Sequence, residues 1–212
     1  MPATARRSIQ RLAPETASRI AAGEVIERPL SALKEVLENA LDAGARRVEI
    51  AVEGSLDRGF TVADDGGGIG ADELELALER HATSKIASLD DLDRLASLGF
   101  RGEALPSIAA VSRLRITSRT EGEESAASIE VNGGAVEGGA AIERGRAARA
   151  RGTTVEIREL FFNTPARRKF LKSPAGELRA ALRMIEACGL AFPEVALRVT
   201  VDGKERLDWP AA

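Results

Sequence analysis

The sequence has little of the chemistry on which disulfide-rich, zinc-binding or base-stacking proteins depend. Its 212 residues include one cysteine, Cys188, and one histidine, His81. These counts exclude a disulfide framework and a zinc site built from cysteine and histidine. Aromatic residues make up only 3% of the chain, with no tyrosine and one tryptophan, so stacking on exposed nucleic-acid bases is not an expected mode of binding.

Long apolar runs and an excess of positive charge are also missing. No stretch approaches the roughly 20 apolar residues that cross a bilayer, and no charged segment followed by an apolar one opens the chain as a secretory signal does. We therefore expect a cytoplasmic, intracellular protein. The net charge of −3 argues against a uniformly basic nucleic-acid surface but leaves room for local basic patches.

The apolar patterning predicts an α+β protein. Strands that alternate apolar and charged residues form a sheet with one packed face and one more open face. Helices over the packed face complete a two-layer α/β sandwich, with a mixed β-sheet and the helices on one face. Helices are expected at 15–27, 34–42, 102–110 and 177–187, and strands around 48–52, 60–62, 114–116, 129–131, 155–157 and 195–201.

Several shorter segments carry local signals. Asp72 followed by Glu75 resembles a capping box and predicts a helix through Arg80. The remaining expectations are a short helix capped by Asp90 or Asp91 and ending near Gly99, a hairpin-type turn at Asn132 and Gly133, an exposed basic loop at 138–151, and a partly mobile N-terminal arm with the first helix at 1–24.

The segment KEVLENALDAG at 34–44 carries an acidic stripe. On a helix, the side chains at i, i+3, i+4 and i+7 share one face, which here presents Glu35, Glu38, Asn39 and Asp42. Asn39 offers a neutral oxygen to Mg²⁺ beside phosphates, and Glu35, one turn earlier, can accept a proton from an attacking water. Glu38 can orient either group. The alternative is a solvated amphipathic face, which is the more common origin of an isolated stripe.

A second segment, ADDGGGIG at 63–70, follows an alternating strand. An ionised Asp64 only accepts hydrogen bonds, so in a pocket it suits the exocyclic amine of adenine and repels the carbonyl of guanine. The glycines let backbone come close to a ligand. An ordinary Asp-Gly turn is the alternative.

A third region, HATSKI and GFRGEAL within 81–105, suits phosphate. Lys85 supplies positive charge, Gly99 and Gly102 let the backbone curl, and a helix starting after Gly102 directs free N–H groups outward. No GxxxxGK[ST] motif is present, which excludes a P-loop. The Thr153–Thr154 pair before a strand can bond the base or Asp64, although threonine also favours strand starts.

Together these blocks resemble the GHKL ATPases, which include gyrase B subunits, ninety-kilodalton heat-shock chaperones and sensor histidine kinases. The strings AAGEVIERP, RHATSKI, LGFRGEAL and FFNTPARRKFL are similar to the MutL family of mismatch-repair ATPases, and the likeness runs from about residue 9 to 171. The resemblance implies the GHKL (Bergerat) fold over 15–207, with ATP and Mg²⁺ as cofactors.

Residue roles follow from the resemblance position by position. It implies Glu35 as the general base, Asn39 as the Mg²⁺ ligand and Asp64 as the adenine reader. The other implied nucleotide-binding positions are Glu38 and Asp42 on the helix, Gly66, Gly68 and Ile69 at the pocket floor, Thr83, Ser84 and Lys85 at the phosphates, the lid Gly99, Phe100, Arg101, Gly102, Glu103, Ala104 and Leu105, and Thr153 and Thr154 beside Asp64. Asp65 departs from the asparagine common in the family, which we expect to affect metal or water more than adenine.

The resemblance further implies a slow ATP-driven switch. Mg·ATP would order the lid and the arm, two N-terminal domains would pair, and hydrolysis would release them. The implied partners are a MutS-type mismatch-recognition protein, DNA and a downstream nuclease or helicase. The family continues into a second lobe that supplies a lysine to the γ-phosphate, so we expect this chain to be an N-terminal ATPase domain with 208–212 as the start of a linker, binding nucleotide but hydrolysing it slowly.

Two alternatives use the same residues differently. A sensor-kinase catalytic domain would need a phospho-acceptor helix, for which His81 is a poor candidate. A nucleotide-independent DNA-binding scaffold would use the basic residues at 144–151 and 167–172 and would lose affinity as salt rises; solvated surface charge also explains the second cluster.

Overall fold

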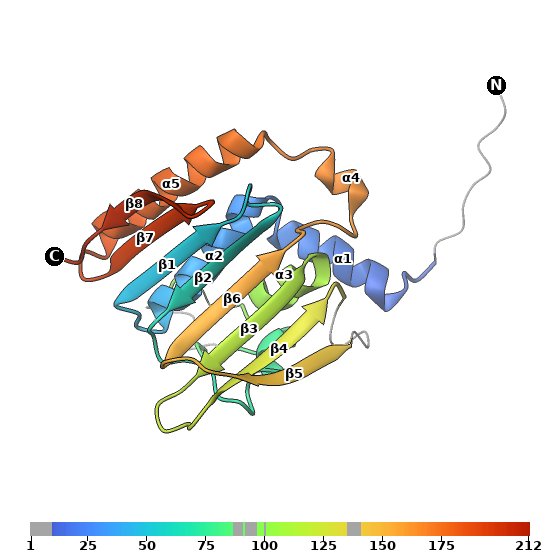
Figure 1. Cartoon of the computed structure of the whole chain (residues 1–212). Coiled ribbons are helices and arrows are strands. Elements are labelled where there is room, and N and C mark those ends of the chain that lie inside the picture. Colours follow the sequence, from blue (N-terminus) through green and yellow to red (C-terminus); the bar gives the residue numbers. More distant parts are fainter. Residues whose placement is uncertain (1–9, 87–90, 92–96, 100, 135–140) are drawn as a thin grey trace.

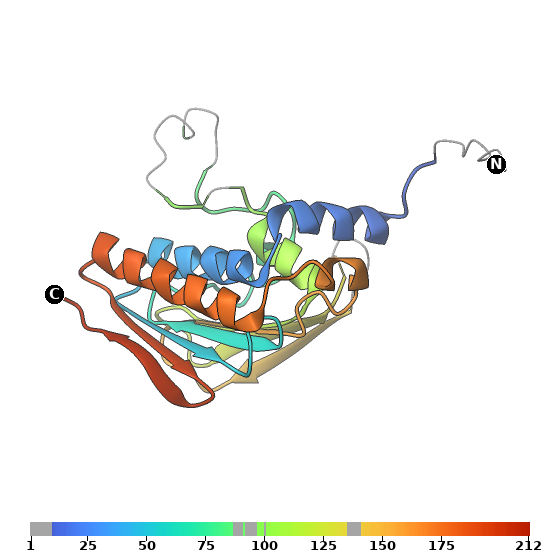
Figure 2. The same ribbon diagram turned by 90° about the horizontal axis from the view of Figure 1, so that it is seen from above.

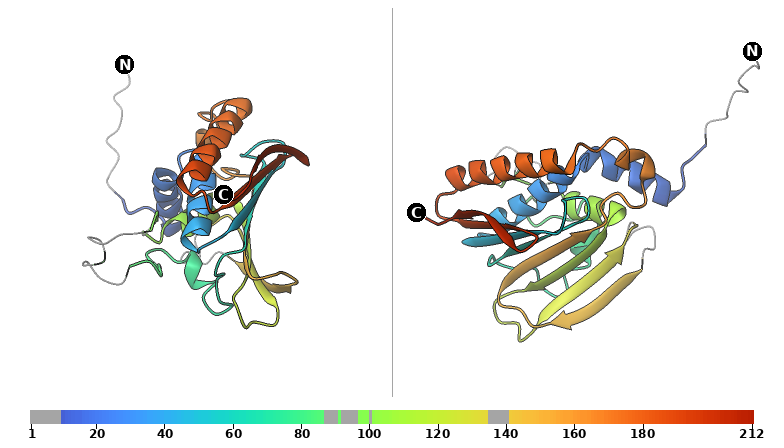
Figure 3. Two further views of the ribbon diagram at one scale, coloured as in Figure 1. Left: turned by 90° about the vertical axis from the view of Figure 1, so that its left-hand side faces the viewer. Right: turned by 45° about the horizontal axis from the view of Figure 1, so that its top comes forward.

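The fold places one layer of helices against one face of a sheet. A computed structural model describes residues 10–86, 91, 97–99, 101–134 and 141–212. Within this part the strands form a single eight-stranded sheet, seen from its open face in Figure 1. The turned views show the helix layer and the sheet layer side by side (Figure 2, Figure 3). None of the helices in the described part is long and apolar enough to cross a bilayer.

The helices are α1 (Pro14–Val25), α2 (Pro29–Asp42), the 3₁₀ helix η1 (Leu76–Leu78), α3 (Ala104–Val111), α4 (Pro165–Arg168) and α5 (Pro174–Ala191). The strands are β1 (Arg47–Val52), β2 (Gly59–Asp64), β3 (Arg113–Arg119), β4 (Ala126–Asn132), β5 (Ile142–Ala147), β6 (Gly152–Arg158), β7 (Ala196–Val201) and β8 (Lys204–Trp209). Their order in the sheet is β5-β4-β3-β6-β2-β1-β7-β8. Among the strands of the described residues, only the β1–β7 pair is parallel. The predicted two-layer α+β fold with a mixed sheet is confirmed.

Helix α2 buries its apolar side in the core and carries the predicted site residues on its other side. Leu33 and Leu37 are at most 1% exposed, and each such burial contributes roughly 1.5–3 kcal/mol. The helix starts at Pro29, the residue expected to open this element, where the fixed φ of proline suits the first helical turn. It ends as predicted, because Gly44 has a φ of +72° just after the C-cap residue.

The register of three central strands brings their polar ends together. Ala63 at the end of β2 lies opposite Thr154 near the start of β6. Ser118 near the end of β3 lies opposite Thr153. Asp64, the last residue of β2, is therefore positioned beside polar residues that are distant in sequence.

The predicted capping-box helix at 72–80 is wrong. The segment consists of turns and the single 3₁₀ turn η1, and no side chain caps η1. The Glu75 carboxylate instead pairs with Arg144 at 2.5 Å, so it is not available to the N-terminal N–H groups. The turns bury Leu74 and Leu78 and leave Leu76 half-exposed.

The predicted exposed loop at 138–151 is wrong in its central part, where β5 pairs with β4. Backbone hydrogen bonds hold this edge strand, and its side chains are largely exposed. A strand held in this way needs few bulky apolar residues, so the sequence showed no alternation. The turn predicted at Asn132 and Gly133 agrees with the end of β4 and with a φ of +68° at Gly133.

Other boundaries differ less from expectation. Pro106 lies in the first turn of α3, as predicted, and α1 and α5 cover the expected ranges within a few residues. Because β8 pairs with β7, Asp208 and Trp209 belong to the sheet and the range expected as linker begins inside it. The helix expected to end near Gly99 and the first nine residues of the arm lie outside the described residues.

Candidate functional site

The Asp64 carboxylate is fixed at the end of β2 by backbone donors. It is 9% exposed, and its Oδ1 accepts hydrogen bonds from the N–H groups of Gly66 at 2.9 Å and Thr153 at 3.2 Å. Burial raises the pKa of Asp64, and these two bonds oppose that rise. Since both bonds reach Oδ1, Oδ2 keeps its capacity to accept from a ligand within the described surroundings.

The glycines after Asp64 allow backbone to pack against backbone. A Cβ at Gly66 would lie 2.9 Å from the Ala43 carbonyl oxygen. At Gly68 the φ is +81°, and a Cβ would lie 2.3 Å from the carbonyl oxygen of Arg119. Ile69 then donates its N–H to the Ser118 hydroxyl at 2.7 Å. The predicted pocket floor is therefore a tightly packed strip between α2 and β3.

Two residues that the sequence did not point to complete this end of the site. Ser118 is fully buried and its hydroxyl also lies 2.9 Å from that of Thr153. Arg149 donates to the Asp64 carbonyl oxygen at 2.6 Å and to the Thr154 hydroxyl at 2.8 Å. No local pattern could have identified them, because their partners lie on other strands.

The role of the threonine pair differs from the one expected of its hydroxyls. Thr153 holds Asp64 through its backbone N–H, and its hydroxyl faces Ser118. Thr154 bonds Arg149 and does not contact the Asp64 carboxylate. Successive side chains of a strand point to opposite faces, so only one of the pair can face the carboxylate.

At the other end of the site, α2 meets Lys85 and the start of the lid segment. The Lys85 ammonium donates to Asn39 Oδ1 at 2.8 Å and forms a short ion pair with Asp42. The Asp42 carboxylate also accepts the N–H groups of Leu98 at 2.9 Å and Gly99 at 3.1 Å. Backbone N–H groups at the start of the lid, which were expected to donate to phosphates, donate to the Asp42 carboxylate in this structure. A carboxylate, like a phosphate, is an anion that accepts hydrogen bonds through its oxygens.

These oxygens fit a magnesium ion. Asn39 Oδ1 already accepts from a cation, and Mg²⁺ commonly takes one or two protein oxygens and completes its shell with phosphate and water. Among the described residues no group of three or more histidine, cysteine or acidic side chains is arranged to hold a metal by itself. The Lys85 ammonium already bonds this oxygen, so Lys85 and a metal would compete for Asn39.

The two glutamates of α2 have different environments. Burial raises the pKa of Glu35 from its usual 4.5 and the negative charge of Glu38 adds to the rise, while Lys34, Lys85 and Arg101 oppose it. Glu38 instead pairs with Lys34 at 2.8 Å. The expectation that Glu38 orients Glu35 or Asn39 is therefore not matched by its contacts.

The segment around Lys85 packs against the start of α3. Gly102 has a φ of +61°, and its carbonyl accepts the N–H of His81 at 3.1 Å. Glu103 Oε1 lies 3.5 Å from His81 Nδ1, and the Thr83 hydroxyl accepts the N–H of Lys85 at 3.2 Å. Ala104 and Leu105 begin α3, Ser84 and Arg101 are exposed, and Phe100 lies outside the described residues.

Asp65 points away from this arrangement. Its Oδ1 accepts the N–H groups of Arg46 at 2.7 Å and Arg47 at 2.9 Å, so it holds the start of β1. The expected effect of Asp65 on metal or water thus has no contact to support it.

The basic cluster after the FFNTP turn is partly structural. Arg167 lies on α4, which the sequence did not predict, and donates to the carbonyl oxygens of Gly23 and, at 2.9 Å, Ile26. Its guanidinium also lies 5.8 Å from the centre of the Phe161 ring. Arg167 therefore ties α4 to the end of α1, while Arg168 and Lys169 are exposed.

A buried carboxylate at a strand end, a glycine strip and a polar helix face define a nucleotide-site architecture, and comparison with known families agrees. Residues 27–159 match the family described as "Histidine kinase-, DNA gyrase B-, and HSP90-like ATPase". This match covers more than half of the chain, and the chain belongs to that ATPase family.

Within the family the chain is similar to MutL proteins. It is 54% identical to the DNA mismatch repair protein MutL of Xanthomonas oryzae pv. oryzae (strain PXO99A), over 93% of this chain and 31% of that protein. It is 52% identical to MutL of Thiobacillus denitrificans, over 94% of this chain and 33% of that protein. The chain thus spans about a third of the length of the curated relatives it matches.

Solved structures show the same similarity. The Aquifex aeolicus MutL ATPase domain complexed with ADP matches with a TM-score of 0.71 and 34% identity, over 89% of this chain and 65% of that one. The N-terminal domain of a DNA repair protein matches with a TM-score of 0.74 and 27% identity, over 91% and 55%. The predicted resemblance to MutL and the predicted GHKL fold are confirmed.

Proposed function

We propose that this chain binds Mg·ATP and hydrolyses it slowly, as the N-terminal ATPase domain of a MutL-type mismatch-repair protein. Family membership and the MutL similarity support the general activity. The observation that carries the proposal is the buried Asp64 carboxylate, which has one oxygen held by two N–H groups and the other left to accept.

Asp64 would select adenine. An amine donor on the base satisfies Oδ2, whereas a carbonyl at the same place would bring a second acceptor, with partial negative charge, against the carboxylate. A base that lacks this amine would bind weakly, because Asp64 is largely buried and an acceptor buried without a donor carries its full desolvation penalty. Gly66 and Gly68 would let the base approach the backbone strip.

Asn39 would hold Mg²⁺, which would supply charge neutralisation at the transferred phosphate. Glu35 would accept the proton of the attacking water, a role for which a pKa raised above the usual range is suited. Lys85 and the N–H groups of the lid would exchange Asn39 and Asp42 for phosphate oxygens. Thr83, Ser84 and the residues that open α3 lie on the segments that would follow this exchange.

We further propose that the exchange acts as a switch in the cytoplasm. Binding of Mg·ATP would order the lid at 99–105 and the arm at 1–24 and would favour pairing of two N-terminal domains, and hydrolysis would reverse it. Within the longer protein, this switch would couple a MutS-type mismatch-recognition protein on DNA to a downstream nuclease or helicase.

Calorimetric titration of the chain with Mg·ATP tests this function. We expect binding heat for the unaltered chain and for Asp65→Asn, and about 10- to 100-fold weaker affinity for Asp64→Asn, corresponding to loss of one charge-assisted hydrogen bond of about 1.5–3 kcal/mol. Asp65 is the matched control because its carboxylate faces β1. An absence of heat from the folded, unaltered chain would refute the proposal.

A further inference from the structure

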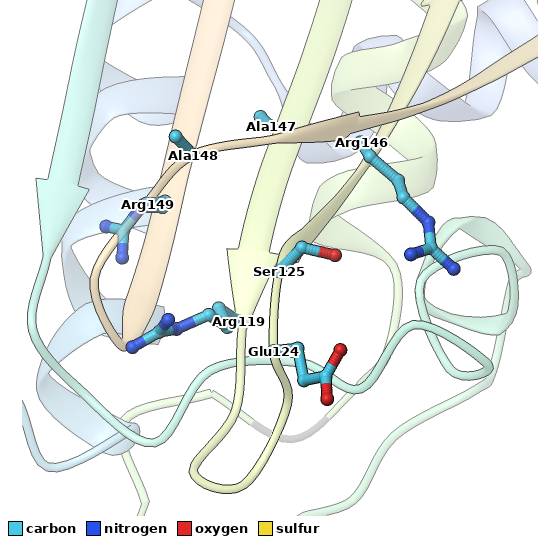
Figure 4. Close-up of a pocket in the computed structure, with 7 residues that line it drawn as sticks. All are labelled: Arg119, Glu124, Ser125, Arg146, Ala147, Ala148 and Arg149. Carbon is cyan, nitrogen blue, oxygen red and sulfur yellow. The ribbon is translucent and has the colours of Figure 1, made fainter.

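The single histidine of the chain has no part in the proposed function, although it lies four residues before Lys85. His81 is in a turn and has a φ of +64°, a value that histidine, asparagine and aspartate adopt more often than other residues except glycine. Its side chain is 76% exposed. It lines neither the cavity of Arg119, Arg146 and Arg149 shown in Figure 4 nor the cavity between α2 and α5. The distinctive feature of His81 is therefore its backbone conformation.

His81 lies between two anchored residues. Before it, the Arg80 guanidinium donates to the carbonyl oxygen of Ser18, a buried residue of α1, at 3.1 Å. After it, Lys85 donates to Asn39 Oδ1 of α2 at 2.8 Å. Because both neighbours are held to helices, the left-handed conformation of His81 determines the path of the chain from α1 to α2.

The end of the lid holds the same turn. The Gly102 carbonyl oxygen accepts the N–H of His81 at 3.1 Å, and Glu103 Oε1 lies 3.5 Å from the imidazole Nδ1. The two backbones are in close contact, since a Cβ at Gly102 would lie 2.4 Å from the carbonyl oxygen of Ala82. A change in the conformation of His81 therefore disturbs a backbone contact as well as a side-chain contact.

The two segments meet a second time at Lys85. The Asp42 carboxylate accepts both the Lys85 ammonium and the N–H of Gly99, the latter at 3.1 Å. A Cβ at Gly99 would lie 3.3 Å from Lys85 Nζ. His81 and Lys85 thus mark the two ends of a short segment that is fixed against the lid at both ends, so a displaced backbone at one end moves the other.

We propose that His81 is a positioning residue for the phosphate groups of ATP, acting through its left-handed backbone and not through its imidazole. Its conformation keeps Lys85 where the ammonium reaches the oxygens of α2 and, on binding, those of phosphate. This inference rests on the proposed nucleotide function, because it assigns how one phosphate-binding side chain is placed. A residue that tolerates a positive φ can replace His81, whereas a β-branched residue cannot.

Calorimetric titration of variants of the whole chain with Mg·ATP tests this role. His81→Val places a β-branched side chain in the left-handed region, and we expect about tenfold weaker affinity. His81→Gly and His81→Asn remove the imidazole but keep the conformation, so their affinity should stay within about threefold of the unaltered chain. Asp202→Val is the control, because Asp202 also has a positive φ, of +50°, but lies between β7 and β8. It should leave Mg·ATP affinity unchanged.

A double-mutant cycle distinguishes positioning of Lys85 from a general loss of stability. If His81 acts through Lys85, His81→Val should weaken Mg·ATP binding by less than about twofold in a chain that already carries Lys85→Met. A purely structural effect would weaken binding equally in both backgrounds, and that result would contradict the proposal.

Three further results would overturn it. Equal weakening by His81→Gly and His81→Val would assign the role to the imidazole. Unchanged affinity in His81→Val, with the fold intact by circular dichroism, would show that the conformation does not position Lys85. Loss of single-turnover hydrolysis in His81→Gly with affinity kept would show imidazole chemistry. An absence of heat from the unaltered chain would refute the proposed function as well, whereas the other results would refute this inference alone.

Discussion

The two ends of the candidate site are built by different means. At the adenine end, Asp64 is held by backbone N–H groups of β6 and of its own strip, and a buried Ser118 joins that strip to β3. At the cation end, Asn39, Asp42 and Lys85 hold one another through side chains. The sheet determines the first end, whereas the second depends on contacts that a ligand can replace.

This difference suits the Asp64 end to recognising a base and the Lys85 end to changing conformation when a ligand binds. A carboxylate fixed by strands needs no rearrangement to bind a base, which keeps the cost of ordering low. In the proposed mechanism, the Lys85 ammonium would move from Asn39 when Mg²⁺ and phosphates arrive, and the N–H groups bonded to Asp42 would move with it. Differential contacts of this kind are what a ligand needs to shift a conformational equilibrium.

The largest expected effect tests the cation end. Glu35→Gln keeps the shape of the side chain but removes its ability to take a proton, so the single-turnover rate of ATP hydrolysis should fall by about 10²–10⁴-fold while Mg·ATP affinity stays within a fewfold. Glu186→Gln, an exposed glutamate on α5 outside the site, is the control. Equal losses in both variants would contradict the assignment of Glu35.

The next effect tests the rigidity of the adenine end. Gly68→Ala introduces a Cβ 2.3 Å from a backbone oxygen at a φ of +81°, so the free energy of unfolding should drop by about 1–3 kcal/mol and ATP affinity should fall with it. Gly67→Ala is the control, because a Cβ there meets only the Ala43 carbonyl at 3.6 Å. Urea denaturation measures the difference. Equal stability of the two variants would show that the backbone around Gly68 can move to accommodate a Cβ, and would contradict a rigid strip.

A smaller effect tests whether Lys85 competes with the metal. Lys85→Met removes the cation from Asn39 and Asp42, so Mn²⁺ in the absence of nucleotide should bind about fivefold more tightly, from the loss of an ion pair worth about 1 kcal/mol. Electron paramagnetic resonance of free Mn²⁺ measures this affinity. Lys169→Met, at the exposed end of α4, should change nothing. Weaker Mn²⁺ binding in Lys85→Met would show that Lys85 assists the metal.

The smallest effect is on the pH dependence of stability without nucleotide. Burial raises the pKa of Asp64 above its usual 3.8, so the folded state holds that proton more tightly and the ionised form destabilises the fold at neutral pH. Asp64→Asn should therefore raise the melting temperature at pH 7.5, and the gain should shrink as pH falls through the raised pKa. A gain that grows toward acid pH would contradict the sign.

The sequence predicted the parts of the site that lie within single elements. The spacing of Glu35 and Asn39 placed both on one side of α2, and the position of Asp64 after an alternating strand placed it at a sheet edge. It could not predict Arg149 or Ser118, because their partners lie across strands. The sequence also predicted a helix cap at Glu75, which instead forms an ion pair with Arg144. It gave no sign of β5, because backbone hydrogen bonds to β4 hold this strand and its side chains do not alternate between apolar and polar.

In the proposed function, the Asp64 carboxylate reads the amine of adenine. Competition calorimetry of the unaltered chain with Mg·ATP and Mg·GTP at equal concentration measures whether the site distinguishes the two bases. ATP should bind and GTP should fail to displace it, because the guanine carbonyl would face the free oxygen of Asp64. Comparable affinity for the two nucleotides would contradict the account.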